Sequence, residues 1–305
     1  MSQTKIKNKT NLHAPVLLQE VLDTLAPKKG EKYLDLTAGY GGHASEVLSI
    51  TQGAATLVDR DENAIEVLRS KFADYRQVNF LHSDFLTASQ TLVKENQKYD
   101  LILADLGVSS PHLDNADRGF SILQDGPLDM RMDPSQDLSA EVVVNTYSAT
   151  ELERILRTYG EEPKARRMAQ LIVESRPLKT TSELAGIAKK VWPGHSRSHP
   201  ATRLFQAVRI EVNDELGQLS QVLPLMVELL AENGRIVIIT FHSLEDRIVK
   251  QFFKDKAGDR YDAELIDLTK RPLQATPNEL VINPRSRSAK IRAAQAKIKT
   301  KRRKG

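Results

Sequence analysis

The chain has 305 residues, of which 40% are hydrophobic and 28% are charged, and it contains no cysteine. This length and composition predict a soluble globular protein, either one large domain with an insertion or two domains. The absence of cysteine excludes disulfides, cysteine-ligated zinc and a thiolate nucleophile. No run approaches the roughly 18 apolar residues that span a bilayer, and the N-terminus lacks the hydrophobic region of a signal peptide. A cytoplasmic protein without membrane contact is therefore predicted.

Positive charge is concentrated at the C-terminal end. From Arg285 onward the sequence has ten Lys and Arg residues and no acidic residue, whereas the net charge of the whole chain is only +4. The rest of the chain is therefore acidic overall. A basic tail from about residue 285 predicts contact with a polyanion such as nucleic acid, although a solvated tail would have the same composition.

Short apolar runs alternate with helical patterns in the first third of the chain. Strands are predicted over residues 32–36, 55–59, 78–82 and 101–106. Helices are predicted from about 43 to 49 and over 61–72. Helical patterns then fill the next part of the chain until a strand returns at 235–241. The pattern predicts a doubly wound α/β domain over residues 1–110 and 201–305, interrupted by a helical insertion over 111–200.

The turn after the first strand reads DLTAGYGGHASEVL, and its Gly39, Gly41 and Ala44 match the dinucleotide-binding pattern G-x-G-x-x-[GA]. Glycine lets the backbone approach a ligand closely at the N-terminus of a helix. Asp59, at the end of the second strand, is placed to accept hydrogen bonds from an adenosine ribose. These features fit NAD and S-adenosylmethionine equally well.

Two later segments favour methyl transfer over hydride transfer. HSDFL places Phe85 after the third strand, where a side chain would border an adenine. ADLGVSSP places Asp105 at the end of the fourth strand, in a turn like the one with which amino-group methyltransferases hold an exocyclic amine. Methylation of pyrimidine C5 usually needs a thiolate, and no lysine stands beside these motifs for attack by a ribose oxygen. An exocyclic nitrogen, N4 or N6, is therefore the preferred acceptor.

Eight sequence blocks resemble, in the same order, the bacterial S-adenosyl-L-methionine-dependent methyltransferases that modify N4 of a decoding-centre cytidine in 16S rRNA. They include HAPVLLQEVL, ADLGVSSPHLDNADRGFSILQDGPLDMRMDP, TYGEEPKARRMAQLI, HPATRLFQAVRIEVNDEL and TFHSLEDRIVKQFF. The resemblance implies a Rossmann-like class I methyltransferase domain with a helical inserted domain for substrate recognition. It also implies the small ribosomal subunit as partner, and it leaves open whether the protein forms a homodimer.

The resemblance further implies a cofactor site formed by Gly41, Gly42, His43, Asp59, Phe85, Asp105 and His112. His112 stands where the family usually has glutamine. Asp105 is the predicted catalytic residue, because a carboxylate there would accept the N4 hydrogens and orient the amine. Two alternatives stay open: a DNA amino-methyltransferase, and a non-catalytic assembly factor that binds rRNA through the basic tail.

On a helix predicted over residues 201–216, an apolar stripe consists of Leu204, Val208 and Val212. The opposite face consists of Arg203, Gln206, Arg209 and Asn213. That polar face would suit RNA phosphate, but an ordinary solvated helix face would have the same pattern.

Further along, polar residues near the predicted site have both a functional and a structural interpretation. Arg118, Asp129 and Arg131 follow the turn at Asp105 closely in sequence, and they would either shape the base pocket or form structural ion pairs between the insertion and the core. The histidines have no metal-binding spacing, so no metal is predicted. Ser243 with Asp246 predicts a helix capping box rather than a nucleophile.

Overall fold

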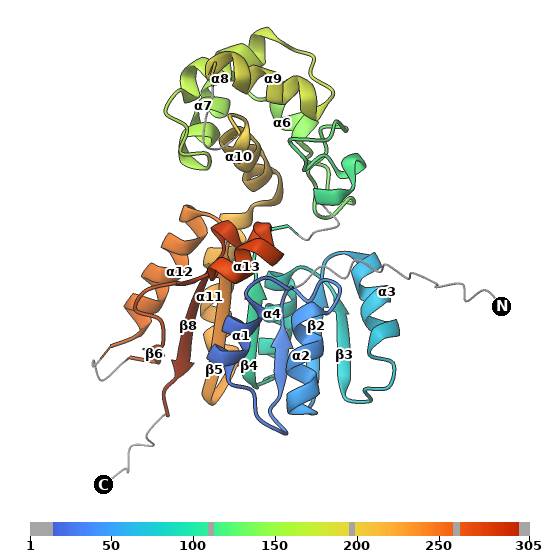
Figure 1. Ribbon diagram of the computed structural model, residues 1–305, viewed down its shortest axis with the longest axis vertical. Helices are drawn as coiled ribbons and strands as arrows, with labels where there is room; N and C mark the ends of the chain where they lie inside the picture. Colours follow the sequence, from blue (N-terminus) through green and yellow to red (C-terminus); the bar gives the residue numbers. More distant parts are fainter. Residues whose placement is uncertain (1–14, 109–112, 195–198, 259–262, 299–305) are drawn as a thin grey trace, which may run out of the picture.

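The computed structural model describes residues 15–108, 113–194, 199–258 and 263–298 (Figure 1). A mixed β-sheet with helices on both faces forms one part of the described protein, and a group of helices forms the other. The strands are β1 (Tyr33–Asp35), β2 (Ala55–Asp59), β3 (Val78–His82), β4 (Tyr99–Asp105), β5 (Leu230–Thr240), β6 (Leu265–Asp267), β7 (Leu273–Gln274) and β8 (Lys290–Ala296).

The strand order is β3-β2-β1-β4-β5-β8-β6, with β7 also paired to β8. Strands β1 to β5 run parallel to one another, whereas β8 runs antiparallel to β5 and β6. This is a Rossmann-like arrangement, so the predicted fold class is confirmed. The strand order reverses between β1 and β4, and in such sheets a crevice forms there, beyond the carboxyl ends of the strands.

Helices cover both faces of the sheet because alternate side chains of each strand point to opposite faces. Tyr33 packs in one hydrophobic cluster with three helices, and Leu34 packs in the cluster on the other face. The first cluster includes α1 (Leu18–Leu25), α2 (Gly42–Thr51) and α3 (Glu62–Lys71). The second includes α4 (Phe85–Lys94), α11 (Glu215–Leu229) and α12 (Ser243–Lys256). Burial on both faces explains why β4 is almost continuously apolar.

The predicted strands at 55–59 and 78–82 coincide with β2 and β3, and the other three overlap β1, β4 and β5. The segment expected to be a basic tail from Arg285 differs, because β8 lies inside the sheet between β5 and β6. Arg292 of β8 is 5% exposed and its Nε lies 2.7 Å from Asp246 Oδ1 of α12. A charged strand can be buried here because a helix distant in sequence supplies the opposite charge.

The separate group of helices packs around its own hydrophobic cluster. Its helices are α6 (Ala140–Thr146), α7 (Ala149–Thr158), α8 (Ala165–Glu174), α9 (Thr181–Val191) and α10 (Thr202–Asn213). The cluster extends from Phe120 to Val212 and includes the predicted apolar stripe of α10. The predicted helix over 201–216 is divided at Asp214, whose φ of 46° ends α10 before α11 begins. None of the described helices is long and apolar enough to cross a membrane.

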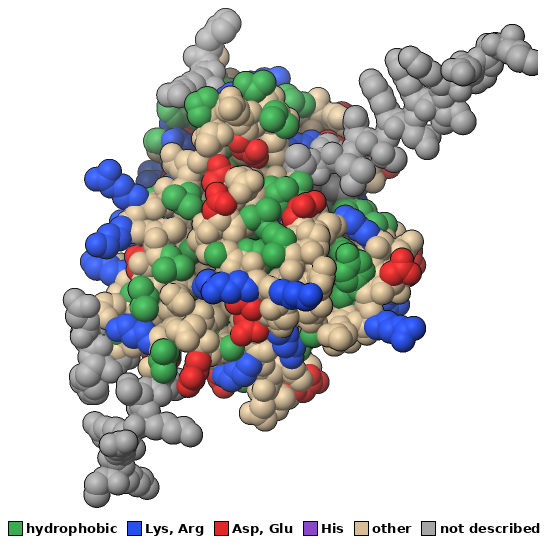
Figure 2. All heavy atoms as spheres, turned by 60° about the horizontal axis from the view of Figure 1, so that its bottom comes forward, with side chains coloured by type: hydrophobic (Ala, Val, Ile, Leu, Met, Phe, Trp, Pro, Cys, Tyr) green, Lys and Arg blue, Asp and Glu red, His purple; other side chains and the backbone are tan. Residues whose placement is uncertain are grey.

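Two short elements complete the described chain, α13 (Pro277–Ile282) and the 3₁₀ helix η2 (Pro284–Ser288), which lead into β8. A further 3₁₀ helix, η1 (Ala116–Arg118), lies before α6. On the face of the protein that Figure 2 presents, Lys and Arg side chains are interspersed with Asp and Glu and do not gather into one basic patch.

Candidate active site

Three aspartates stand at the carboxyl ends of neighbouring strands. Asp35 ends β1, Asp59 ends β2 and Asp105 ends β4, with β1 between the other two. Because the three strands are parallel, these carboxyl groups meet at one edge of the sheet. A cavity of about 1080 Å³ opens at this edge, and Asp59 and Asp105 are part of its lining.

The glycine turn between β1 and α2 forms one wall of the cavity. Gly41 has a φ of 72°, in the left-handed region that favours glycine, and it is the N-cap of α2. A Cβ at Gly41 would lie 2.8 Å from Phe72 Cε2, and a Cβ at Gly42 would lie 2.7 Å from Pro15 Cγ. Larger residues at these positions would therefore displace the turn from its neighbours. Gly42 lines the cavity and Gly41 supports the turn beside it.

Asp59 and Phe85 form the next part of the wall. Asp59 accepts hydrogen bonds from Gly39 N at 2.8 Å and Asp61 N at 2.9 Å, one on each carboxylate oxygen. Burial raises the pKa of Asp59, and the two backbone donors oppose this shift. Each oxygen keeps a second lone pair that can accept from a ligand hydroxyl. Phe85, the first residue of α4, adds an aromatic surface to the lining.

Asp105 lies at the centre of the cavity edge. Its Oδ1 is buried and has no hydrogen-bond partner within the described parts of the chain. Burial, followed by the charges of Asp35 and Glu245, raises the pKa of Asp105 well above its usual range. His43 Nδ1 lies 3.9 Å from Asp105 Oδ2, and burial lowers the pKa of His43 to about 4. The neutral imidazole therefore packs beside the carboxyl group without neutralising it.

The opposite wall is built by α10, α11 and the start of α12. Arg209 Nε lies 2.8 Å from Glu215 Oε1 in a two-pronged ion pair. Glu245 Oε2 accepts from the backbone nitrogens of Phe241 and His242 at 2.8 and 3.2 Å. Burial raises the pKa of Glu245 to about 7; the charge of Glu215 adds to the shift and Arg209 opposes it. Glu245 was not among the predicted site residues.

The predicted capping box of Ser243 and Asp246 is wrong by one residue. The N-cap of α12 is His242, whose Nδ1 accepts from Glu245 N at 3.3 Å, and Glu245 returns the bond to the N-cap backbone. An imidazole nitrogen takes the place of the usual hydroxyl oxygen, a substitution that the common capping pattern does not include. Ser243 Oγ instead donates to Glu161 Oε2 at 2.7 Å.

The polar face predicted on α10 is largely occupied by partners inside the protein. Gln206 donates to a backbone carbonyl at 2.8 Å, and Asn213 accepts from a buried backbone amide at 2.8 Å. Arg209 is held by its ion pair, whereas Arg203 is exposed. The face therefore has a structural role at three of its four positions.

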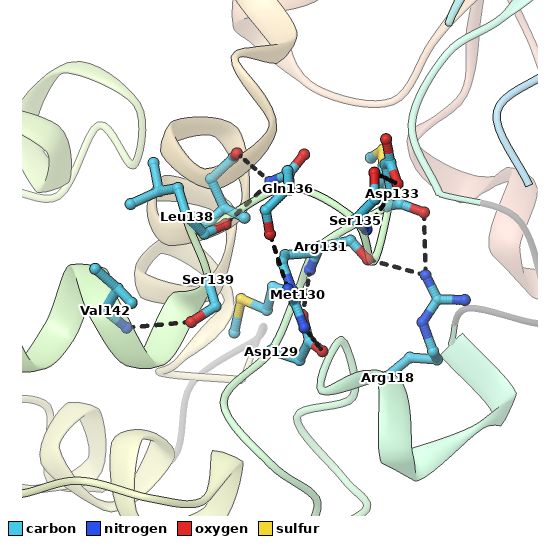
Figure 3. Close-up of polar contacts among 12 residues, drawn as sticks. Arg118, Asp129, Met130, Arg131, Asp133, Ser135, Gln136, Leu138, Ser139 and Val142 are labelled. Atoms are coloured by element: carbon cyan, nitrogen blue, oxygen red, sulfur yellow. Dashed lines mark hydrogen bonds and ion pairs between the residues drawn. The ribbon is translucent and has the colours of Figure 1, made fainter. Parts of the chain in front are cut away.

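Arg118, Asp129 and Arg131 form a hydrogen-bonded cluster in the insertion (Figure 3). Arg131 Nε lies 2.7 Å from Asp129 Oδ1, and Arg131 Nη1 donates to Gln136 O at 2.8 Å. Arg118 donates to the backbone carbonyls of Arg131 and Met132 at 2.9 and 3.1 Å. These side chains fold the loop before α6 and are not part of the cavity lining. Their role is structural, but the ion pair of Arg131 with Asp129 lies within the insertion instead of joining it to the core.

Glu215, His242 and Glu245 also have the spacing of a metal-ligand group, since one ligand atom from each lies within 4.8 Å of the others. Arg209 already provides a cation for Glu215. His242 Nδ1 accepts the capping bond, so the neutral ring carries its proton on Nε2, the nitrogen that faces the acids. A protonated nitrogen cannot bind a metal, so this arrangement favours the existing ion pair over a bound metal ion.

The chemistry of the sheet edge fits a cationic nucleoside better than a dinucleotide. Asp35 is buried and Asp59 and Asp105 are half-buried at this edge, and desolvation raises the pKa of each. A positive ligand would stabilise these carboxylates, whereas a pyrophosphate would add to their repulsion. S-adenosyl-L-methionine carries positive charge on sulfur and nitrogen and has ribose hydroxyls for Asp59. The residues present therefore fit S-adenosyl-L-methionine.

The structure brings most of the predicted site residues to one cavity. The lining includes Gly42, His43, Asp59, Phe85 and Asp105. Predicted His112 lies outside the described residues. The remaining lining that matters chemically comes from Arg209, Glu215, His242 and Glu245, which sequence reasoning placed on an RNA face or omitted. The sequence offers one signal for these residues: Glu245 stands three residues after His242, just beyond the strongly apolar strand β5.

In a comparison with known proteins, residues 10–297 match the MraW methylase family. A relative from Clostridioides difficile, named ribosomal RNA small subunit methyltransferase H, is 44% identical over 305 aligned positions, covering 93% of this chain and 98% of the relative. A relative of the same name from Trichormus variabilis is 46% identical and covers 96% of this chain and 94% of itself. A solved rRNA methylase from Streptococcus thermophilus matches with a TM-score of 0.40 and 8% identity, covering 92% of this chain and 94% of that one.

Proposed function

The chain belongs to the MraW methylase family, and from that premise we propose that it transfers the methyl group of S-adenosyl-L-methionine to N4 of a decoding-centre cytidine in 16S rRNA. Relatives that cover almost the whole chain are named ribosomal RNA small subunit methyltransferases. The observation that carries the proposal is the buried Asp105 Oδ1, which lies at the cavity edge without a partner in the described protein. Because the proposed substrate belongs to the small ribosomal subunit, we propose a cytoplasmic reaction.

Cofactor binding is assigned to the half of the cavity nearest the glycine turn. Asp59 accepts from the ribose hydroxyls, Phe85 borders the adenine, and the backbone of Gly42 allows close approach of the methionine end. His43 fills the space behind Asp105. When bound, S-adenosyl-L-methionine supplies an electrophilic methyl group on a positively charged sulfur.

Asp105 orients the acceptor. A pKa raised by burial favours the neutral carboxyl group in the free protein. The positive charge of a bound cofactor would stabilise the carboxylate form, and in that form Asp105 can accept hydrogen bonds from the N4 amino group. Holding the amine in this way aligns its lone pair, and such positioning can contribute up to roughly 7–11 kcal/mol in well-oriented systems. A strong general base is not required, because the amine becomes acidic as its nitrogen is alkylated.

The helical insertion is proposed to recognise the RNA around the target. Thr202, Phe205 and Gln206 of α10 line the same cavity as Asp105, so the insertion forms the wall opposite the cofactor. A target base must leave its stack to enter, at a cost of a few kcal/mol. As part of this proposal the insertion extends over 111–213 and the sheet domain over 1–110 and 214–305, which moves the predicted boundary at 200 to the end of α10, because α10 packs in the hydrophobic cluster of the insertion. All the residues that this proposal uses belong to one chain, so the homodimer that the sequence leaves open is not needed for it.

The basic residues after β8 are proposed to contact RNA phosphate. Residues 299–305 contain five Lys and Arg and lie outside the described residues. Because Lys297 N donates to Glu264 O at 2.9 Å, a deletion should begin after residue 298 to leave the sheet intact. Deleting 299–305 should weaken binding to small subunits and make its salt dependence shallower. An unchanged salt dependence would show that these residues make no phosphate contacts.

The direct test supplies labelled S-adenosyl-L-methionine together with assembled small subunits, naked rRNA or duplex DNA. Nucleoside mass spectrometry then locates the label. Label on N4-methylcytidine from rRNA supports the proposal. Label in DNA would indicate a DNA amino-methyltransferase, and cofactor binding without label on any substrate would indicate a non-catalytic assembly factor.

A further inference from the structure

Two of the buried side-chain atoms that lack hydrogen-bond partners line the cavity. Across the described ranges, the buried unpartnered atoms are Asp105 Oδ1, His242 Nε2 and Arg235 Nε. Arg235 lies in the middle of β5, outside the cavity lining, and pairs with Glu31. Asp105 and His242 both belong to the cavity lining. Buried polar atoms are rarely left unpaired without a functional reason, so a ligand with matching groups is expected here.

The proton of His242 is fixed by the helix that it caps. Glu245 N donates to His242 Nδ1 at 3.3 Å, so Nδ1 must present a lone pair. Burial, and then the charge of Arg209, lower the pKa of His242 to about 3. The ring is therefore neutral at physiological pH and carries its single proton on Nε2. His242 Nε2 lies 3.4 Å from Glu245 Oε1, but the two atoms are not hydrogen-bonded.

The hydrogen-bond acceptor Asp105 and the donor His242 lie at the carboxyl ends of the neighbouring strands β4 and β5. Asp105 of β4 is in register with Ile239 of β5, and His242 comes three residues later, at the start of α12. One edge of the sheet thus presents a hydrogen-bond acceptor from β4 beside a donor from the end of β5. This pair of groups is complementary to a ligand that presents a donor and an acceptor on one edge.

We propose that His242 is a specificity-determining residue whose Nε2–H donates to O2 of the target cytosine while Asp105 accepts from N4. The inference rests on the proposed function. Cytosine has an amino donor and a carbonyl acceptor at the two ends of its pairing edge, which matches Asp105 and His242. Adenine also has an exocyclic amine but has a C–H group where cytosine has O2. Uracil places a carbonyl oxygen against Asp105 instead of an amine.

Glu245 is the positioning residue for this donor. Its Oε2 accepts from the backbone nitrogens of Phe241 and His242, and its own backbone nitrogen holds His242 Nδ1. These three hydrogen bonds fix the ring and its tautomer. The cap thus determines which ring nitrogen is offered to the base.

The test compares His242→Asn with the wild type on small subunits that carry either cytosine or adenine at the target position. Asparagine is a favoured N-cap, so α12 keeps its cap, but its side chain is too short to place a donor where Nε2–H lies. The rate on cytosine should fall about 10- to 100-fold, as expected when a buried acceptor loses its donor. The rate on adenine should stay within about threefold, and so should the cofactor dissociation constant. The preference for cytosine therefore shrinks.

Ser243→Ala is the matched control, since Ser243 is the next residue of the same helix end and bonds Glu161 outside the cavity lining. Its preference for cytosine should equal that of the wild type. If adenine transfer is too slow to measure, the ratio of the dissociation constants of the two kinds of subunit measures the preference instead, and His242→Asn should reduce that ratio. A His242→Asn protein whose preference is unchanged would overturn the inference. A wild-type protein that forms no N4-methylcytidine would instead overturn the proposed function, and the inference with it.

Discussion

The carboxyl edge of the sheet and the helical insertion differ in whether their polar side chains have hydrogen-bond partners inside the protein. At the sheet edge, burial raises the pKa of Asp35 and of Asp105, a neighbouring aspartate adds to each shift, and Asp105 Oδ1 has no partner among the described groups. In the insertion, Arg131 and Asn213 direct their polar atoms to partners a few residues or one helix away. Both regions contain abundant charged residues in sequence.

The difference shows that functional and structural polar groups are distinguished less by residue type than by whether each buried group has its hydrogen-bond partners. A buried group with all its hydrogen bonds made stabilises the fold, and its loss is felt as instability. A buried group that repels its neighbours or lacks a partner costs stability and is retained where a ligand compensates it. The two regions should therefore respond differently to substitution, one in activity and the other in stability.

The strongest test of this contrast is Asp105→Ala. We expect methyl transfer to fall about 10²–10³-fold or more, because the group that orients the amine is lost. Stability should stay the same or rise, since a buried unpartnered carboxyl group is removed. Single-turnover rates and urea unfolding measure the two effects.

Asp100→Ala is the matched control on the same strand. Asp100 Oδ2 accepts from Lys32 N at 2.8 Å at the far end of β4, away from the cavity. Its transfer rate should stay within about threefold of the wild type. Equal loss of activity in both variants would mean that β4 as a whole, and not Asp105, carries the effect.

Much of the sheet edge can be predicted from sequence because its signals are local. Apolar runs, a glycine turn and an acid at a strand end identify β1, β2 and β4 together with Asp59 and Asp105. Parallel strands then place their carboxyl ends side by side. The polar partners in the insertion cannot be predicted this way, since Asn213 bonds a backbone amide 81 residues away.

Other features depend on contacts that no local pattern encodes. β8 was predicted as part of a basic tail, but it pairs with β5 and β6 in the sheet, and Asp246 compensates the charge of its buried Arg292 across 46 residues. The cap on α12 uses His242, a residue that capping rules do not include. Glu245 belongs to the cavity only because α10 and α11 bring Arg209 and Glu215 against it.

The second prediction concerns Asp35, which ends β1 between the two other strands. Burial raises the pKa of Asp35 to about 7. A carboxyl group that is harder to ionise in the folded state destabilises the fold as pH rises from about 4 to about 7, and the penalty is constant above that. Asp35→Asn removes the penalty. The difference in the free energy of unfolding between variant and wild type should therefore grow by about 2–3 kcal/mol from pH 5 to pH 8.

Urea unfolding at the two pH values measures this difference. The amide keeps an oxygen for Thr37 N, which donates to Asp35 Oδ1 at 3.2 Å, so the turn should retain its shape. Asp255→Asn is the control, because it makes the same substitution at an exposed position of α12. A difference between wild type and Asp35→Asn that is the same at both pH values would contradict the assignment.

The insertion should show the reverse behaviour in Asn213→Ala. Asn213 Oδ1 accepts from Met132 N and its Nδ2 donates to Met130 O, both at 2.8 Å. Removing the side chain leaves two buried backbone groups unpaired, which should lower the free energy of unfolding by about 2 kcal/mol. Thermal unfolding measures the loss, and transfer at a temperature where the variant is folded should stay within about threefold. A large loss of transfer in a fully folded variant would place Asn213 in the RNA interface.

The smallest effect is expected where the two regions touch. Glu161, in the loop after α7, lies 2.9 Å from Arg247 Nη2 and accepts from Ser243 Oγ, both on α12. The side chains of Glu161 and Arg247 are 43% and 65% exposed, and such solvated ion pairs contribute about 0–1 kcal/mol. Glu161→Gln keeps the hydrogen bond to the serine and removes only the charge. We therefore expect a change below 0.5 kcal/mol in unfolding, reduced further by salt. A larger change in transfer than in stability would mean that this contact sets how the insertion faces Asp105, and the two regions would then act as one unit.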